Sequence, residues 1–109
     1  MDIEYKFRGI KFKWNSEKER ANVRKHDGID FKRACQIFFD PFIVPGKTEE
    51  QDESRGVAIG ADFDLKILFV VHLIVEDDHI RIISARKADT KERKIYENCI
   101  LEEEETWFF

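Results

Sequence analysis

The alternation of apolar and polar residues along the chain predicts a short strand followed by a helix. Apolar residues alternate with lysines over Ile10–Trp14, which is the two-residue period of a half-exposed strand. Asn15 then offers an N-cap, and Ser16 and Glu19 have the spacing of a capping box. We therefore expect a first helix over Ser16–His26, which ends near Gly28 because glycine readily adopts the left-handed conformation.

A second helix is predicted to begin at Asp30 as its N-cap and to end at Asp40-Pro41. Its apolar residues recur at i, i+3, i+4 and i+7 and therefore share one side of the helix. These residues are Phe31, Ala34, Cys35 and Phe38. Residues 45–55 combine Pro, Gly and an acidic cluster, and this composition predicts a polar loop.

Three strands and a final helix are predicted in the second half. The strands are Val57–Phe63, Lys66–Val75 and His79–Ala88. The second is almost wholly apolar, as expected of a central strand covered on both sides. A short acidic turn precedes the third strand, so these two should form an antiparallel hairpin. The last helix is expected to begin at Thr90 and to bury Ile95, Tyr96, Cys99 and Ile100.

The predicted order of elements is β-α-α-β-β-β-α. Consecutive strands joined by short turns favour an α+β fold, in which helices pack on an antiparallel β-sheet. The length of 109 residues indicates a single domain over 1–109, with 42% apolar residues to form its core.

Charge is distributed unevenly, although the net charge is only −4. Residues 1–33 hold ten Lys/Arg against six Asp/Glu, and residues 79–94 hold six against two. The intervening residues 34–78 and the C-terminal residues 95–109 are acidic. If the fold brings the two basic segments together, they form a positive surface that attracts phosphates, whereas apart they are ordinary solvated faces.

Several classes of protein are excluded by what the chain lacks. Its two cysteines, Cys35 and Cys99, are far apart, which argues for a reducing compartment and against a disulfide framework or a zinc site. The first residues are too charged for a signal peptide, and the apolar run Ile67–Val71 is too short to span a bilayer. We expect a cytoplasmic protein with no membrane partner, no metal and no cofactor.

Basic residues suited to phosphate chemistry lie at the end of the first helix, namely Arg24, Lys25 and His26. Cleavage of RNA without a metal needs a base for the ribose 2′-OH, cations for the phosphorane and an acid for the leaving oxygen. Histidine titrates near neutral pH, and arginine matches the phosphate oxygens. An equally simple interpretation is that Lys25 and His26 only interact with the C-terminal carbonyls of the helix.

A second group of candidates lies on the last strand, namely Arg81, Ser84, Arg86 and Lys87. Strict alternation places Ser84 and Arg86 on one face with Ile80 and Ile82, and places Arg81 and Lys87 on the other. Arg86 either pairs with a carboxylate such as Glu92 or reaches a substrate. Two histidines have plain alternatives: His72 is typical of a core histidine, and His79 beside a turn is typical of an exposed one.

Several segments resemble the BrnT family of toxins. They are Phe12–Asn15, Asn22–Phe31, the stretch Ala34–Pro41 and Arg55–Gly60. The most specific match is Ile80–Ala88, reading I-R-I-I-S-A-R-K-A, followed by Thr90, Glu92-Arg93 and Tyr96-Glu97. The resemblance spans about residues 10–98. Asn15 stands where the family usually has Asp, and Asp27 is inserted between His26 and Gly28.

The resemblance implies a compact RelE-like fold and a ribonuclease toxin of a type II toxin–antitoxin system. Such toxins cleave RNA and inhibit translation. A BrnA-type antitoxin neutralises them in a hetero-oligomer, and operon DNA is contacted only through that antitoxin. Matching positions give Lys25, His26, Arg81 and Arg86 as catalytic residues, and Arg24, Ser84 and Lys87 as RNA-binding residues.

Two other functions are compatible with the sequence. One is a non-catalytic regulatory binding protein with the same fold, that is, a degenerate toxin. The other is a DNA-binding protein, which the mainly apolar second helix disfavours because a recognition helix is usually basic. The nuclease hypothesis requires the basic residues near 24–26 and 81–87 to meet around one phosphate-sized pocket.

Overall fold

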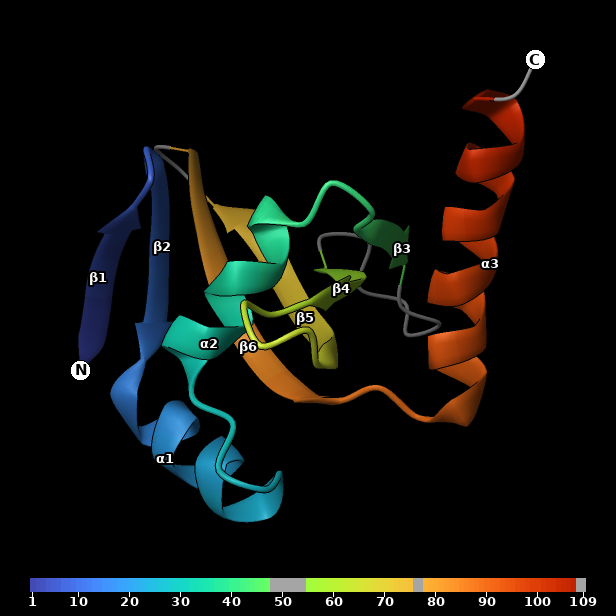
Figure 1. The fold of residues 1–109 in the computed structure, drawn as a ribbon. Coiled ribbons are helices and arrows are strands. Elements are labelled where there is room, and N and C mark those ends of the chain that lie inside the picture. Colours follow the sequence, from blue (N-terminus) through green and yellow to red (C-terminus); the bar gives the residue numbers. More distant parts are fainter. Residues whose placement is uncertain (48–54, 76–77, 108–109) are drawn as a thin grey trace.

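A computed structural model describes residues 1–47, 55–75 and 78–107 of the chain. One mixed sheet with strand order β1-β2-β6-β5-β4-β3 forms its body (Figure 1). The strands are β1 Asp2–Phe7, β2 Ile10–Asn15, β3 Val44–Lys47, β4 Arg55–Ala61, β5 Ile67–Val75 and β6 His79–Lys87. The helices are α1 Ser16–Lys25, α2 Phe31–Gln36, the short 3₁₀ helix η1 Ile37–Phe39 and α3 Thr90–Trp107.

The α+β class and the four predicted strands are confirmed, but the predicted order lacks β1 and β3. Ile3, Tyr5 and Phe7 alternate with polar residues in β1. Arg8 and Gly9 form a two-residue turn with φ of 50° and 84°, as in a type I′ hairpin, and β1 pairs antiparallel with β2. Arginine is unusual at a left-handed position, which is why the turn has only a weak signal in the sequence.

The prediction of a purely antiparallel sheet is wrong, because β2 pairs in parallel with β6. The other neighbouring strands are antiparallel. The loop expected over 45–55 is also shorter than predicted, since Val44–Lys47 forms β3 against β4. Pro45 fits there because β3 lies at the edge of the sheet. The remainder of that loop, residues 48–54, lies outside the described residues.

The main core lies between one face of the sheet and α2 with η1. Fully buried side chains come from β2, α2, η1, β5 and β6: Phe12, Trp14, Phe31, Ala34, Cys35, Ile37, Leu68, Val70, Ile82 and Ala85. Ile37, which was not among the residues predicted on the buried side of the second helix, is fully buried, while Phe38, which was, is only partly buried. The change from α to 3₁₀ geometry after Gln36 explains this, because it alters the angle between successive side chains.

The predicted cap of the first helix is confirmed, but Glu19 does not close a capping box. The Asn15 Oδ1 atom accepts hydrogen bonds from the backbone N–H groups of Glu17 and Lys18, both at 3.0 Å. The Glu19 carboxylate instead accepts from Trp14 Nε1 at 3.1 Å and from the Phe31 backbone at 2.8 Å. Glu19 therefore links β2, α1 and α2.

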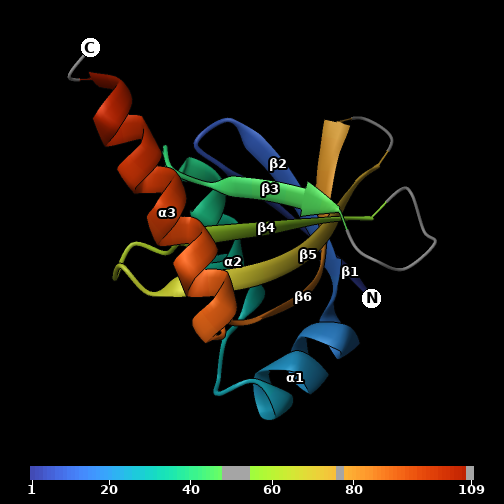
Figure 2. The same cartoon turned by 90° about the vertical axis from the view of Figure 1, so that its right-hand side faces the viewer.

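The N-cap of α3 is Asp89, one residue before the predicted cap, Thr90. Asp89 accepts from the Glu92 backbone at 2.8 Å, and Glu92 accepts from the Asp89 backbone at 2.9 Å, which is a reciprocal capping box. On the buried side of this helix Tyr96 is 6% exposed, whereas Ile95 is 41% exposed, contrary to prediction. α3 packs across the ends of β3 and β4 (Figure 2). None of the described helices is long and apolar enough to cross a membrane.

Asp40 connects α3 to the rest of the fold. Its Oδ2 atom accepts hydrogen bonds from the Tyr96 hydroxyl at 2.6 Å and from the Ala61 backbone at 2.8 Å. Burial raises the pKa of Tyr96, and the neighbouring Asp40 carboxylate raises it further. Tyr96 is therefore a neutral hydrogen-bond donor at physiological pH, and one carboxylate joins η1, β4 and α3.

A buried amide joins α1 to β6. The Asn22 Nδ2 atom donates to the carbonyl oxygens of Ala85 and Ile29, at 2.8 and 3.2 Å. The Asn22 Oδ1 atom accepts from the Ala85 backbone at 3.1 Å. β2 pairs with β6 only around Arg81, so farther along β6 a side chain of α1 satisfies the backbone groups that a strand would otherwise bind.

Replacement of Asn22 should therefore be costly. In Asn22→Ala the N–H and C=O of Ala85 lose their partners, and the free energy of unfolding should fall by about 2–4 kcal/mol. Urea denaturation measures this change. Asn98→Ala, at an exposed position of α3, is the matched control and should change stability by less than about 1 kcal/mol. Equal losses in the two variants would contradict the role given to Asn22.

A buried carboxylate fixes the turn between β4 and β5. Asp62 is 3% exposed and accepts hydrogen bonds from Arg33 Nε at 2.6 Å and from the backbones of Asp64 and Lys66, both at 2.9 Å. Burial opposes ionisation of this group, but the bonds from Arg33 and the backbone outweigh it and lower the pKa of Asp62 from 3.8.

This lowered pKa predicts an acid-sensitive contribution to stability. The unfolded chain binds the proton more tightly, so Asp62 stabilises the fold fully above pH 3.8 and less as the pH falls through the lower folded-state pKa. Asp62→Asn should lose about 2 kcal/mol at pH 7, and its deficit should shrink in acid. Unfolding free energies of both proteins between pH 2 and 7 test this. A deficit that grows in acid would be inconsistent with it.

Candidate phosphate-binding face

A β-bulge in β6 places three candidate residues on one face of the sheet. Ser84 pairs with Val71 and Ile82 pairs with His72, so Ile83 is an extra residue in β6. Because of this extra residue, Ile82 and Ala85 are both on the core face, with exposures of 1% and 0%. Arg81, Ser84 and Arg86 therefore share the opposite face, which we call the outer face.

The predicted division of β6 into two faces is thus wrong in its first half. Strict alternation separates Arg81 from Ser84 and Arg86, whereas the bulge brings them to the same side. Lys87 pairs with Leu68 and belongs to the core face, where it is exposed at the end of the strand. A bulge has no reliable signal in a continuous run such as I-R-I-I-S-A-R, so the sequence offered no means of locating it.

Cations form a row across the outer face. Arg81 pairs with Lys13 of β2 on one side and with Leu73 of β5 on the other, and Leu73 pairs with Arg55 of β4. Paired residues of adjacent strands project to the same side of a sheet. Lys13, Arg81 and Arg55 therefore lie in one line across four strands, and neither Lys13 nor Arg55 was among the sequence candidates.

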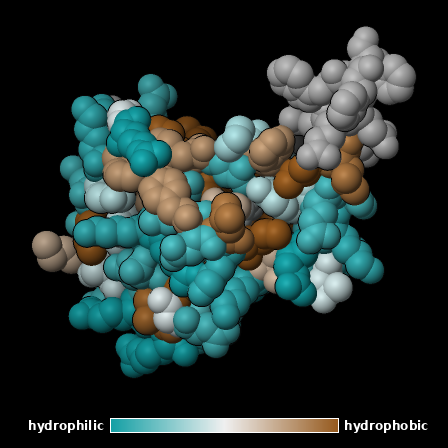
Figure 3. Space-filling view, viewed as in Figure 1, coloured by the Kyte–Doolittle hydropathy of each residue, from teal (hydrophilic) through white to brown (hydrophobic). Residues whose placement is uncertain are grey.

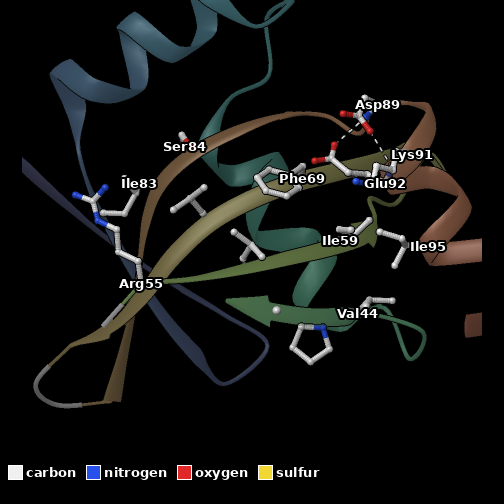
Figure 4. A pocket seen from close by; sticks show the side chains of 14 residues that line it. Val44, Arg55, Ile59, Phe69, Ile83, Ser84, Asp89, Lys91, Glu92 and Ile95 are labelled. Atoms are coloured by element: carbon white, nitrogen blue, oxygen red, sulfur yellow. Dashed lines mark hydrogen bonds between the residues drawn. The ribbon is translucent and has the colours of Figure 1, made fainter. Parts of the chain in front are cut away.

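A cleft opens on the outer face where α3 leaves the sheet. It has a volume of about 840 Å³, and its side chains come from β3 to β6 and the start of α3 (Figure 4). Its floor is apolar: Val44, Val57, Ile59, Phe69, Val71, Ile83 and Ile95. Its polar lining residues are Arg55, Ser84, Asp89, Lys91 and Glu92. In the space-filling view, hydrophobic surface borders the hollow between the sheet and α3 (Figure 3).

Arg86 is held beside this cleft by Glu92. Its two terminal nitrogens donate to the two Glu92 oxygens at 2.7 and 2.8 Å, and its guanidinium lies 4.2 Å from the centre of the Phe69 ring. The hydrogen bond to Glu92 raises the pKa of Arg86. Nη1 also donates to the Lys87 carbonyl. Among the described residues, Nε and one N–H of Nη2 have no acceptor, so Arg86 can still donate to a ligand.

Arg81 is paired with the first strand. Its terminal nitrogens approach the two Asp2 oxygens at 3.3 and 2.6 Å. The side-chain hydrogen bond from Arg81 lowers the pKa of Asp2, which stays ionised at neutral pH. The Asp2 side chain is 51% exposed, so this pair is accessible to a competing anion.

The basic end of α1 lies next to the second half of β6 but is not part of the cleft. Asn22, one turn before Lys25, is hydrogen-bonded to Ala85, so the backbone at the end of α1 lies near β6, while the Lys25 side chain is exposed. The backbone N–H of His26 donates to the Asn22 carbonyl as the helix ends. Neither Lys25 nor His26 lines the cleft that Ser84 lines.

Arg24 lies elsewhere. It lines a second cavity, of about 740 Å³, together with Trp14 of β2 and Lys32 of α2. The structure thus brings Arg81, Ser84 and Arg86 together on the outer face. None of Arg24, Lys25 and His26 lines the cleft that Ser84 lines, so this cleft is not the shared pocket that the nuclease hypothesis requires. Arg24 and Lys87 are separate from that group.

The remaining histidines have structural surroundings. The His72 ring packs edge-on against Phe38, with 5.1 Å between ring centres, and burial lowers its pKa. This agrees with the expectation of a core histidine. His79 is partly buried at the start of β6, not exposed as expected. Among the described residues, no three His, Cys, Asp or Glu side chains are grouped as metal ligands would be.

The Arg86–Glu92 pair should make a measurable contribution to stability. A double-mutant cycle of Arg86→Ala and Glu92→Ala should give a coupling of about 1 kcal/mol, because the pair is bidentate and partly buried. Denaturant unfolding of the four proteins measures it. The same cycle on Arg81 and Asp2, which is more exposed, should give a smaller coupling. A larger value for that second pair would contradict this assignment.

Comparison with known proteins identifies the family. Residues 14–92 match the family model of the ribonuclease toxin, BrnT, of type II toxin–antitoxin systems. The crystal structure of the Brucella abortus ribonuclease toxin, BrnT, is similar, with a TM-score of 0.56 and 26% identity over 71% of this chain and 94% of that one. No curated protein matches the chain. The matched region holds all the candidates from Arg24 to Lys87, and the chain therefore belongs to the BrnT family of type II toxins.

Proposed function

We propose that this toxin cleaves RNA without a metal ion and binds its substrate on the outer face of the sheet. The observation that carries the proposal is the bulge at Ile83, which puts Arg81, Ser84 and Arg86 on one face of the sheet, where Ser84 lines an open cleft. RNA binding depends on local rather than total charge, so the net charge of −4 is compatible with it.

Arg86 is the proposed ligand of the scissile phosphate. Glu92 fixes the plane of its guanidinium, while Nε and one Nη2 hydrogen are available for phosphate oxygens. A preorganised cation of this kind stabilises the additional charge of the phosphorane without reorganising during the reaction. Ser84 can donate its hydroxyl to the same phosphate from the neighbouring position on the outer face.

Arg81 and Lys25 are proposed to hold flanking phosphates. Arg81 would exchange the exposed Asp2 carboxylate for a phosphate, a ligand that its fork-shaped guanidinium fits equally well. Lys25, beside β6, adds a positive charge near the end of that strand. Arg24 and Lys87, which lie apart from the outer face, are assigned to more distant segments of the RNA.

His26 is the proposed acid or base. In this reaction the ribose 2′-oxygen loses its proton and bonds to phosphorus, and the bond from phosphorus to the 5′-oxygen breaks as that oxygen gains a proton. The products are a 2′,3′-cyclic phosphate and a 5′-hydroxyl. Imidazole suits either proton transfer because its ordinary pKa is close to neutral.

The cellular role follows from the family. We propose that RNA cleavage inhibits translation in the cytoplasm, and that a BrnA-type antitoxin neutralises the toxin in a hetero-oligomer that contacts operon DNA through the antitoxin. The fold proposed for this role is RelE-like, with the mixed sheet as its substrate-binding surface. The basic outer face, if it binds RNA, is a natural target for an inhibitor that blocks access to substrate.

Cleavage of a defined RNA by the purified chain tests the proposal. Arg86→Ala and His26→Ala should each lower the cleavage rate by about 100-fold, because each removes one contribution to the transition state. Lys18→Ala removes an exposed cation at the start of α1 and should retain the wild-type rate. Activity should persist in EDTA, and the products should carry 2′,3′-cyclic phosphate ends.

The same assays separate this proposal from the alternatives. Loss of cleavage in EDTA would refute the metal-free mechanism while leaving a nuclease. Growth arrest on expression, without cleavage of any cellular RNA, would favour a toxin that acts by binding. Absence of both effects, with normal affinity for an antitoxin, would identify a non-catalytic regulatory protein.

A further inference from the structure

The first strand forms one edge of the sheet and has an unusual order of charges. β1 pairs with β2 on one side, and no described strand pairs with its other side (Figure 1). The polar residues of β1 are acidic in its first half and basic in its second, namely Asp2, Glu4 and Lys6. These three are exposed, whereas Ile3, Tyr5 and Phe7 are half-buried on the core side.

This order of charges is complementary to itself in the antiparallel direction. If two β1 strands run antiparallel with Tyr5 opposite Tyr5, then each Glu4 lies opposite Lys6 of the second copy. In the same register each Ile3 lies opposite Phe7 of the second copy. Opposite charges and apolar pairs across neighbouring strands both stabilise a sheet. We propose that β1 is a homodimer interface, through which two copies of the chain join their sheets edge to edge.

The surroundings of Lys6 favour a second copy as the partner. Within one chain Lys6 pairs directly with Lys11 of β2, and like charges in this position are unfavourable. Glu4 already faces Lys13 across the same two strands. Glu4 of a second copy would lie on the open side of Lys6 and offset the repulsion from Lys11. The strand pairing described within one chain places no carboxylate directly opposite Lys6.

The core side of β1 also gains from this pairing. The rings of Tyr5 and Phe7 are stacked, with 5.8 Å between centres and 9° between planes. They are half-buried because the sheet ends beside them. A second β1 would extend the apolar surface on that side and cover their exposed edges, with Ile3 and Phe7 in contact across the junction. Burial of apolar surface therefore adds to the charge pairing.

Charged residues on an edge strand also serve to prevent association, which is the competing interpretation. An edge protected in this way repels itself when it carries a single sign of charge in every register. In the register shifted by two residues Glu4 faces Glu4 of the second copy while Asp2 faces Lys6, whereas in the Tyr5-centred register every Glu4 faces a Lys6 and no like charges are directly opposite. The charges thus select one register and do not exclude all of them.

The dimer has a geometric consequence for the outer face. A two-fold axis perpendicular to the sheet at Tyr5 keeps the two outer faces on the same side of the joined sheets. The two rows of Lys13, Arg81 and Arg55 then lie on one continuous surface. β1 precedes residues 14–92, so the interface lies outside the part of the chain that the family model matches. The inference does not depend on RNA cleavage.

Charge exchange at two positions tests the interface in the full-length chain. Glu4→Lys alone and Lys6→Glu alone each place like charges opposite one another twice per dimer. Analytical ultracentrifugation should show a concentration-dependent dimer for the wild type and a dissociation constant at least about tenfold higher for each single variant. The double variant Glu4→Lys/Lys6→Glu restores complementary charges in the same register and should dimerise like the wild type.

A mixing experiment adds a result that unfolding cannot imitate. An equimolar mixture of the two single variants should form heterodimers, because a β1 strand with two lysines at these positions then meets a β1 strand with two glutamates. Lys94→Glu, an equal change of charge at an exposed position of α3 near the opposite end of the sheet, is the control and should leave the dimer intact. Circular dichroism melts confirm that each variant is folded.

The possible results decide the question. A wild type that is monomeric at about 100 µM would overturn the proposal, as would a dimer unaffected by both single variants. A dimer weakened by the single variants but not restored in the double variant or the mixture would overturn the Tyr5-centred register, and with it this interface.

Discussion

The arrangement of the outer face depends on how β6 satisfies its backbone on the side away from β5. β2 reaches only the first part of β6, and beyond it the N–H and C=O of Ala85 would be buried without partners. The Asn22 amide supplies one donor and one acceptor in the positions that a strand would have used. This contact holds the last turn of α1 along the backbone of β6, which neither local helix preference nor net charge would do.

The geometry of β6 itself adds the second constraint. Ile82 and Ala85 both fill the core, which a regular strand cannot achieve with residues three apart. The extra residue, Ile83, lets both side chains face the core, and the resulting bulge turns Arg81 to the same face as Ser84 and Arg86. Core packing therefore determines which cations share a surface. A wrong register would expose the buried apolar residues, and this costs far more free energy than moving exposed arginines to the other face.

The elements that depend on local sequence patterns were predicted correctly, whereas features that depend on contacts between distant segments were not. α1, α2, β4, β5, β6 and the Asn15 cap follow from periodicity and turn residues. β1 was missed because its turn uses Arg8, and β3 because four residues with Pro and Gly resemble a loop. The parallel pairing of β2 with β6, the buried Asn22 and the bulge arise from contacts between distant residues: Lys13 and Arg81 are 68 positions apart, and Asn22 and Ala85 are 63 apart. The candidate residues were found from their charge and chemistry and then from the family resemblance, but their division between faces required the tertiary structure.

Glu92 performs two tasks with one carboxylate. It accepts a hydrogen bond from the Asp89 backbone N–H at the start of α3, and it accepts hydrogen bonds from both terminal nitrogens of Arg86 beside the cleft. An anion that draws the guanidinium toward itself must therefore pull against the first turn of α3, and a frayed first turn must loosen the guanidinium. The start of the C-terminal helix and the orientation of the Arg86 guanidinium are in this way linked through a single carboxylate.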